Sequence, residues 1–348
     1  MRRYLLLEDG ESFEGKAFGS FMEKSGELVF NTSFTGYYEI MTDPSYGGQV
    51  LVFNFPSMFY YDFKLDIPQG NRISASGVVC KDSSIPSGES FLLIDKQMKM
   101  QGVPGIYGID TRKLVKKIRD TGNLRGIISN TPRMPDQWDQ MNTENLVRMF
   151  GTAQNYSIER ESERRLLFVD LGAKASLIDQ VSKMGSLDVV NIFSLPEHLE
   201  NYDMIFISNG PGDPQDKIFH ELKQKLRSTV GKIPITGVCM GHQILGDVLG
   251  AGIEKMTFGH HGSNHAVGNL NQSYITSHNH NYRLNEDSLL KAQIPIIHRD
   301  LNDGTVEMIS MEEKFAMSVQ YHPEGSPGPV NSTGFFDRMK EMLYVIRV

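Results

Sequence analysis

The 348-residue sequence is poor in cysteine and contains only two, Cys80 and Cys239. Two cysteines cannot build the disulfide framework of a small secreted protein, so we expect the protein to work in a reducing cytoplasm. Long apolar runs are also missing, because Glu8 and Asp9 end the short run near the N-terminus. We therefore predict no signal peptide and no association with a membrane.

The sequence has no excess of positive charge. Its 35 Lys and Arg residues face 42 Asp and Glu residues, which gives a formal net charge of −7. Such a chain has no general attraction for nucleic acid, so we expect no nucleic-acid partner. Charged residues make up 22% and hydrophobic residues 39%, as in ordinary globular proteins. A chain of this length and composition predicts two domains.

The first part of the sequence predicts a β-rich domain with flanking helices. Short strand-like segments are separated by turn residues, and "LEDGESF" (7–13) carries the E-D-G turn of a hairpin. A helix is predicted over "TRKLVKKIRDTG" (111–122), with Asp110 or Thr111 as its cap, Gly122 as its end and apolar side chains on one face. We therefore predict an α/β protein whose β-rich N-terminal domain covers residues 1–150.

The second part of the sequence follows a different pattern. Residues 151–164 are polar and show no apolar period, so we predict a linker there. From residue 165 to residue 348, apolar strand-like runs alternate with amphipathic helices. This alternation predicts a doubly wound, mostly parallel sheet covered on both faces. Functional sites in such folds gather at the carboxyl ends of the strands.

The segment "GVCMGHQ" (237–243) places Cys239 between two glycines, directly after a predicted strand and before a predicted helix. This G-x-C-x-G pattern is typical of a nucleophile elbow with sulfur in place of a hydroxyl. Glycines at 237 and 241 would allow the tight turn, and the N-terminus of the following helix would favour the thiolate. We predict that Cys239 is a reachable nucleophile.

A thiol nucleophile needs a base and a group that orients the base. In "VQYHPEGSPGP", His322 and Glu324 are two residues apart, so an extended segment would place both side chains on one face. We predict that they serve as this base and its orienting acid. The glycine-rich turn "SNGPGDP" (208–214) ends another predicted strand, where its backbone N–H groups could form an oxyanion hole.

Two histidine-rich segments, "FGHHGSNHAV" and "TSHNHNYR", suggest a metal site. Neither contains an H-E-x-x-H or C-x-x-C pattern, and we predict that this chain binds no metal. The sequence also has no P-loop, and the dinucleotide fingerprint fails because Gln215 replaces its third glycine. We therefore expect no nucleotide cofactor in this chain.

With "SNGPGDP" (208–214), Cys239, His322 and Glu324 in this order, the second half resembles a class I, triad-type glutamine amidotransferase domain, whose sheet is flavodoxin-like. The segments "LEDGESFEGKAFG", "GELVFNTSFTGYYEIMTDPSY", "GIDTRKL" and "SPGP" extend the likeness. Nearly end to end, the chain resembles the small, glutamine-hydrolysing subunit of carbamoyl-phosphate synthetase. The resemblance implies a Cys-His-Glu triad that hydrolyses L-glutamine through a thioester and supplies ammonia for carbamoyl phosphate, a precursor of arginine and pyrimidines.

The resemblance also implies roles for further residues. Backbone N–H groups of Met240 and of Gly210 or Gly212 would hold the oxyanion. The amino-acid end of glutamine would contact Ser33, Gln243, Asn279, Asn281 and Tyr282. Asn281 stands where the family has glycine, so its side chain would narrow the glutamine pocket.

The implied partner is a large synthetase subunit that binds ATP, Mg²⁺ and bicarbonate, and the family also suggests a higher-order oligomer of heterodimers. Three alternatives remain open. The chain could be an amidotransferase subunit of another synthase, such as one for anthranilate or guanylate. It could be a catalytically silent regulatory subunit. Cys239 could also attack an acyl substrate other than glutamine.

Overall fold

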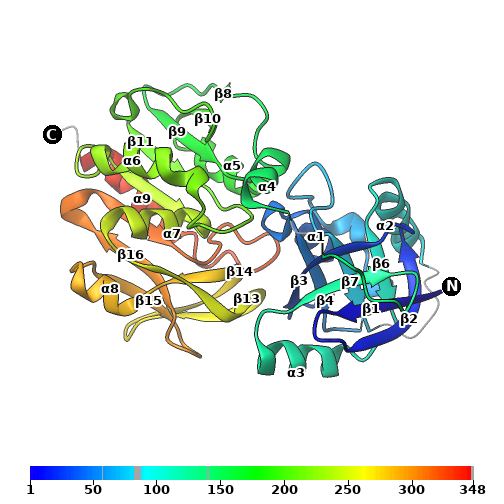
Figure 1. Cartoon of the computed structure of the whole chain (residues 1–348). Helices are drawn as coiled ribbons and strands as arrows, with labels where there is room; N and C mark the ends of the chain where they lie inside the picture. Colours follow the sequence, from blue (N-terminus) through cyan, green and yellow to red (C-terminus); the bar gives the residue numbers. More distant parts are fainter. Residues whose placement is uncertain (57, 82–87, 139–140, 346–348) are drawn as a thin grey trace. The chain divides into compact units, whose positions relative to one another are not determined.

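The computed structural model describes residues 1–56, 58–81, 88–138 and 141–345 of the chain (Figure 1). These residues form two compact units, Met1–Asn142 with Thr257–Gly262, and Thr143–Met256 with Ser263–Val348. Both units combine strands and helices, so the predicted α/β class is confirmed. In the described part of the chain, no helix is long and apolar enough to cross a membrane.

The strands of the N-terminal unit close into a barrel in the order β1-β2-β6-β5-β4-β3-β7. Closure satisfies the hydrogen-bonding groups that the edges of an open sheet would leave exposed. The predicted hairpin is confirmed, because β1 and β2 pair antiparallel with Leu5 opposite Phe13. The seven strands are β1 (Arg2–Leu7), β2 (Ser12–Gly19), β3 (Lys24–Asn31), β4 (Gln49–Phe53), β5 (Gly77–Cys80), β6 (Pro104–Tyr107) and β7 (Arg125–Ser129).

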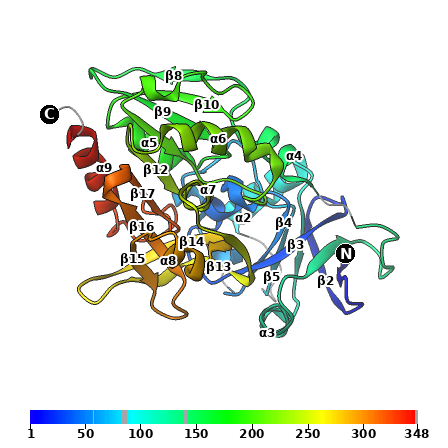
Figure 2. The same cartoon turned by 60° about the vertical axis from the view of Figure 1, so that its left-hand side comes forward.

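Helices pack against both faces of the barrel strands, as the alternation of side chains along β4 shows. Leu51 and Phe53 join one apolar cluster with α2, whereas Val50 and Val52 join another with α3. The predicted helix α3 is confirmed, and of its two candidate caps the structure uses Asp110, whose carboxylate accepts a hydrogen bond from the backbone N–H of Lys113. Figure 2 shows α3 beside the barrel strands. The helices of this unit are α1 (Tyr37–Thr42), α2 (Glu89–Met100) and α3 (Thr111–Thr121).

The C-terminal unit contains a mixed sheet in the order β14-β13-β15-β16-β17-β12-β11-β9-β10-β8. Strands β17, β12, β11, β9 and β10 pair in parallel, which confirms the predicted parallel core, and antiparallel strands extend it on both sides. The strands are β8 (Tyr156–Ile158), β9 (Arg165–Asp170), β10 (Ser186–Asn191), β11 (Met204–Ile207), β12 (Ile235–Val238), β13 (Ile253–Gly268), β14 (Ser273–Leu284), β15 (Ile296–Asp300), β16 (Val306–Met311) and β17 (Ala316–Val319).

Helices cover both faces of the parallel core. Leu166 and Phe168 of β9 face the cluster that contains residues of α5 and α9, and Leu167 and Val169 face the cluster of α6 and α7. Figure 1 shows α6 and α7 in front of the strands. The helices are α4 (Thr143–Phe150), α5 (Ala175–Ser182), α6 (His220–Thr229), α7 (Met240–Leu249), α8 (Glu286–Lys291) and α9 (Gly334–Val345).

The boundary between the units differs from the prediction of a first domain over 1–150 and a linker over 151–164. Helix α4 belongs to the C-terminal unit, where Val147 joins the same apolar cluster as α6 and α7. The segment expected to be a linker contains β8, which pairs antiparallel with β10. Tyr156 and Ser157 of β8 are exposed, so this edge strand lacks the apolar alternation that would have revealed it.

Candidate active site

Cys239 occupies the tight turn between β12 and the ten-residue helix α7. Its backbone φ of 55° and ψ of −107° lie in a region that non-glycine residues rarely adopt. Such a residue carries about 1–3 kcal/mol of strain, which the surrounding structure must hold in place. The strand-turn-helix context that the sequence predicts around Cys239 is therefore confirmed.

The glycines on both sides of Cys239 allow β12 and α7 to approach closely. A Cβ atom at Gly237 would lie 2.6 Å from the carbonyl group of Gly241. A Cβ atom at Gly241 would overlap the carbonyl oxygen of Ile207 on the neighbouring strand. Any side chain at either position would push the helix away from the sheet, so the geometry requires both glycines.

Two kinds of group beside the thiol of Cys239 have opposite effects on its ionisation. The backbone N–H groups at the start of α7 favour the thiolate. The carbonyl oxygen of Asn279 lies 3.4 Å from Sγ and accepts the S–H of the thiol form. Cys239 is only 3% exposed, so the sulfur that the sequence predicts to be reachable is covered in this conformation.

His322 and Glu324 form the predicted pair. Nδ1 of His322 lies 2.7 Å from Oε1 of Glu324, and since a carboxylate only accepts, the ring nitrogen donates this hydrogen bond. The neutral ring then carries a lone pair on Nε2, which has no hydrogen-bond partner among the described residues. Such a nitrogen can take a proton from a thiol.

The backbone reaches this arrangement by a turn, whereas the sequence analysis assumed an extended segment. His322 makes an isolated bridge to Ser277 of β14, and Pro323 and Glu324 form a turn after it. The N–H of Gly325 closes this turn on the carbonyl oxygen of His322 at 3.2 Å. The pair is thus correct, but local turn geometry brings the two side chains together.

Two parallel strands bring Cys239 and His322 to the same edge of the sheet. Val238 of β12 pairs with Val319 of β17, and the N–H of Cys239 donates to the carbonyl oxygen of Val319 at 2.9 Å. Both residues then contact one segment of β14. The N–H of His322 donates to the carbonyl oxygen of Ser277 at 2.8 Å, while the sulfur of Cys239 lies against Asn279.

Lys174 is a member of this site that the sequence analysis missed. It lies between β9 and α5 at the carboxyl end of the sheet, and its side chain is 2% exposed. Its Nζ lies 3.1 Å from Oε1 of Glu324 and also donates to the carbonyl oxygen of Gly325. Its position in the loop that follows a buried parallel strand is the only signal in the sequence, and nothing there links it to Glu324.

Lys174 keeps Glu324 ionised in a buried position. Burial by itself would raise the pKa of Glu324, but the charge of Lys174 and the interaction with His322 outweigh it and lower the pKa to about 2. Glu324 therefore stays a carboxylate at every working pH and holds His322 in the tautomer with a free Nε2. The buried lysine acts on the histidine through the glutamate.

The lowered pKa of Glu324 predicts a stability that depends on pH. This contribution is fully present above the ordinary glutamate pKa near 4.5 and is lost as the pH falls towards 2. Lys174→Met leaves the carboxylate buried without its partner, and we expect a loss of about 3–5 kcal/mol at pH 7 and a smaller loss at pH 4. Urea unfolding at both pH values measures this.

The matched control is Lys183→Met, at the end of the same helix α5. Lys183 forms an ion pair with Asp179, but its side chain is 53% exposed. Such a pair contributes less than about 1 kcal/mol. Equal losses in the two variants would contradict the role given to Lys174.

The loop after β11 contains the glycines predicted to form the oxyanion hole. A Cβ atom at Gly210 would overlap the carbonyl oxygen of Leu171, and one at Gly212 would lie 2.5 Å from Cγ2 of Thr143. Gly212 also has a φ of 103°, which side chains rarely adopt. The geometry thus requires glycine at both positions. That their N–H groups, with that of Met240, hold the oxyanion stays a prediction.

The structure brings several predicted glutamine-binding residues together. Nε2 of Gln243 donates to the carbonyl oxygen of Tyr282 at 2.8 Å and to Oε1 of Gln320 at 3.0 Å. The carbonyl oxygen of Asn279 lies against the sulfur of Cys239. Asn281 lies two residues further along β14 and is 7% exposed. Asn281 is part of a strand and does not adopt a left-handed conformation. Their contacts to glutamine stay a prediction.

Ser33 lies in the N-terminal unit, just after β3. It is 1% exposed, and its backbone N–H donates to Oδ1 of Asn31 at 2.8 Å. The other predicted site residues belong to the C-terminal unit, so the part that Ser33 takes in glutamine binding also stays a prediction.

His242 lies three residues after the nucleophile in the sequence, but it does not assist Cys239 as a charged group. It is fully buried in α7, and its Nδ1 lies 2.9 Å from Oγ of Ser318. Burial lowers the pKa of His242 to about 3, despite the opposing effect of Ser318. This ring is therefore neutral at working pH and supplies no positive charge to the thiolate.

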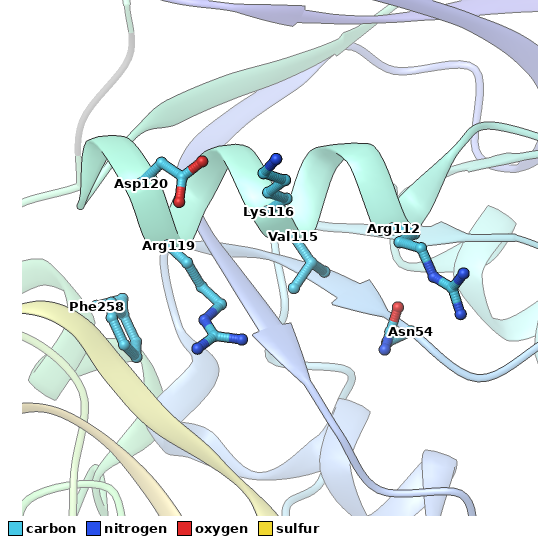
Figure 3. Close-up of a pocket in the computed structure, with 7 residues that line it drawn as sticks. All are labelled: Asn54, Arg112, Val115, Lys116, Arg119, Asp120 and Phe258. Atoms are coloured by element: carbon cyan, nitrogen blue, oxygen red, sulfur yellow. The ribbon is translucent and has the colours of Figure 1, made fainter. Parts of the chain in front are cut away.

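A hollow of about 510 Å³ lies beside α3 in the N-terminal unit, and none of these residues lines it. Figure 3 shows the side chain of Arg119 extending towards Phe258. Three of the side chains that line the hollow are basic. Its lining residues are Asn54, Arg112, Val115, Lys116, Arg119, Asp120 and Phe258.

Two family models match the chain. Residues 5–128 match the CPSase domain of the carbamoyl-phosphate synthase small chain, and residues 167–342 match glutamine amidotransferase class-I. A carbamoyl phosphate synthase small chain from Thermoplasma acidophilum is 42% identical over 98% of this chain and 97% of its own length. Its counterpart from Thermoplasma volcanium is 41% identical over 99% of both chains.

A further relative is the carbamoyl phosphate synthase pyrimidine-specific small chain of Halalkalibacterium halodurans, 36% identical over 99% of this chain and 97% of its own length. The similarity therefore extends over both structural units and over nearly the whole of each relative. The chain belongs to the family of carbamoyl-phosphate synthase small chains and carries a class-I glutamine amidotransferase domain.

Proposed function

We propose that this chain is the glutaminase subunit of a carbamoyl-phosphate synthase. It hydrolyses L-glutamine at Cys239 and delivers the ammonia to a large subunit, which makes carbamoyl phosphate from ATP and bicarbonate. One observation carries the proposal. Lys174, Glu324 and His322 form a buried chain of polar contacts at the carboxyl end of the parallel strands, where Cys239 also lies. The family membership of both units supports the same assignment.

The chemistry is acyl transfer through a thioester. The sulfur of Cys239 bonds to the carboxamide carbon of glutamine, and backbone N–H groups of Met240 and of Gly210 or Gly212 hold the resulting oxyanion. The C–N bond then breaks, and His322 gives the leaving nitrogen the proton that it took from the thiol. A water molecule gives a proton to His322 and attacks the thioester, the C–S bond breaks, and glutamate leaves.

The large subunit supplies what this chain lacks in its sequence. ATP and Mg²⁺ bind there in our proposal, because this sequence contains neither a P-loop nor a dinucleotide fingerprint. Carbamoyl phosphate then serves arginine and pyrimidine synthesis, and one relative is named pyrimidine-specific. A cytoplasmic location and a higher-order oligomer of heterodimers stay predictions.

Two alternative functions would not require all the features that this chain has. An amidotransferase subunit of another synthase would not need the N-terminal unit, whose residues 5–128 match the small-chain domain. A silent regulatory subunit would not need a strained cysteine together with a histidine that is hydrogen-bonded to an ionised glutamate. Both observations favour the glutaminase.

Replacing the nucleophile tests the hydrolysis directly. We expect Cys239→Ser to reduce glutamate release by at least about 10³-fold, because a hydroxyl is a far weaker nucleophile than a thiol at neutral pH. The matched control, Cys80→Ser, removes the other buried cysteine, which lies in the barrel. Glutamate is assayed with and without the large subunit, and we expect slow release alone and faster release in the complex. Full activity of Cys239→Ser would exclude the triad.

Replacing the orienting acid tests the histidine tautomer. We expect Glu324→Gln to lower kcat about 10²–10⁴-fold with little change in KM, because the amide can donate to Nδ1 and force the proton onto Nε2. Steady-state glutamate release measures both constants. Glu200→Gln, at an exposed glutamate, is the control and should behave like the parent chain. A rise in KM with unchanged kcat would instead place Glu324 in substrate binding.

Shortening Asn281 tests the predicted glutamine pocket. Since its side chain would narrow the pocket, we expect Asn281→Gly to lower KM for glutamine about fivefold, which corresponds to about 1 kcal/mol. Asn271→Gly, in the exposed turn before β14, is the control. An unchanged or higher KM in Asn281→Gly would show that this side chain does not limit glutamine binding.

A further inference from the structure

A buried lysine of α6 connects the two segments to which the proposed function assigns the oxyanion. The side chain of Lys223 is 5% exposed. Its Nζ donates to the carbonyl oxygen of Pro214 at 2.9 Å and to Oδ2 of Asp247 in α7 at 2.6 Å. All three residues belong to the C-terminal unit. Lys223 is outside the triad, and no step of the proposed reaction uses it.

The first of these segments is the glycine-rich loop 208–214, which is held at both ends. Its first residue donates a backbone N–H to β9 at 3.1 Å. Its last residue, Pro214, accepts from Lys223. Gly210 and Gly212, whose N–H groups are candidates for the oxyanion hole, lie between these two ends. Their positions therefore depend on the bond to Lys223 as well as on the bond to β9.

The second segment is the helix that begins at the nucleophile. Helix α7 starts at Met240, whose N–H is the other candidate for the oxyanion hole. Asp247 lies seven residues further along the same helix, which is about 10 Å along its axis. Because a helix moves as a rigid element, a bond at Asp247 also limits the displacement of Met240. Lys223 thus joins the loop and the helix at one ammonium group.

The two contacts of Lys223 are the kind that a buried ammonium requires. Taking this charge out of water is costly unless an opposite charge and further hydrogen-bond acceptors surround it. Asp247 supplies the charge, and the carbonyl oxygen of Pro214 is a second acceptor. Arg227, on the same helix α6, also forms an ion pair with Asp247 at 2.7 Å, but its side chain is 52% exposed. None of its hydrogen bonds to described residues reaches the loop.

We propose that Lys223 is a positioning residue of the oxyanion hole. It fixes the end of the loop 208–214 relative to α7, so that the N–H groups of Gly210 or Gly212 and of Met240 keep the spacing that one oxyanion requires. This inference rests on the proposed glutaminase function and adds a residue to it. Preorganised donors act most strongly where negative charge develops in the transition state. Loss of Lys223 therefore lowers kcat and leaves KM almost unchanged.

The competing explanation is that apolar packing alone sets the positions of the loop and the helix. Leu222 and Leu226 of α6 join one apolar cluster with Ile244 and Leu245 of α7. The ion pair would then contribute only to stability, and buried ion pairs often contribute little. Lys223→Met separates the two explanations, because it keeps an apolar side chain of similar length and removes both polar contacts.

Hydrogen exchange of the full-length chain tests the loop without an assay of activity. The amides of Asp213, Gln215 and Asp216 lie on both sides of Pro214 and donate hydrogen bonds. We expect these three amides to exchange about tenfold faster in Lys223→Met than in the parent chain, because the end of the loop loses its bond to α6. Exchange equal to that of the parent chain would overturn the proposal in favour of apolar packing.

The matched control is Arg227→Met, which removes a cation from the same carboxylate of Asp247 but no bond of the loop. We expect the loop amides of this variant to exchange as in the parent chain. If Lys223→Met does not fold, Asp247→Asn takes its place, because it keeps the lysine and removes the charge that holds it to α7. We then expect a smaller acceleration at the same amides, and unchanged exchange would overturn the proposal.

Kinetics of the complex with the large subunit test the oxyanion hole itself. We expect Lys223→Met to lower kcat for glutamate release about 10- to 100-fold and to change KM less than about twofold. Alkylation of Cys239 by iodoacetamide, followed by mass spectrometry, requires the thiolate but no oxyanion hole. We expect its rate to stay that of the parent chain. An unchanged kcat, or an equal loss of alkylation and hydrolysis, would overturn the proposal.

Failure of the glutaminase assignment gives a different result. If the parent chain in the complex releases no glutamate, the proposed function is wrong. The exchange rates of Lys223→Met and Arg227→Met still decide whether Lys223 holds the loop. The two hypotheses are therefore tested by separate measurements.

Discussion

The buried ion pair of Lys174 with Glu324 is the interaction on which the active site depends. A carboxylate in the protein interior would ordinarily take up a proton, and Lys174 prevents this by lowering the pKa of Glu324 to about 2. Only as a carboxylate does Glu324 accept from Nδ1 of His322 and leave Nε2 free to act as a base. Through Glu324, the charge of Lys174 thus determines which nitrogen of His322 carries the proton.

The parallel sheet supplies the second constraint. Strands β12 and β17 run side by side, so the residues that follow them meet at one edge, and these residues are Cys239 and His322. Close packing of α7 on this edge is possible only because Gly237 and Gly241 have no side chains. The strain at Cys239 is therefore maintained by the packing of helix on sheet and is not released locally.

Strand β14 links the base and the nucleophile of the triad. Its residue Ser277 accepts from the N–H of His322, Asn279 faces the sulfur, and the histidines on either side of Asn279 face Glu307. A displacement of this strand would therefore move the base and the environment of the nucleophile together.

The sequence by itself determined the α/β class, the parallel core, the elbow at Cys239 and the His322–Glu324 pair. Each of these features depends on a local signal, which is an apolar pattern, the position of a glycine or a short spacing between residues. The edge strand β8 escaped prediction because its side chains are exposed and carry no apolar alternation. Only the tertiary structure decided that Lys174 lies against Glu324 and that Glu307 lies against His278 and His280. These contacts join residues on different strands and loops, and the path of the chain between them, not any local pattern, sets their distance.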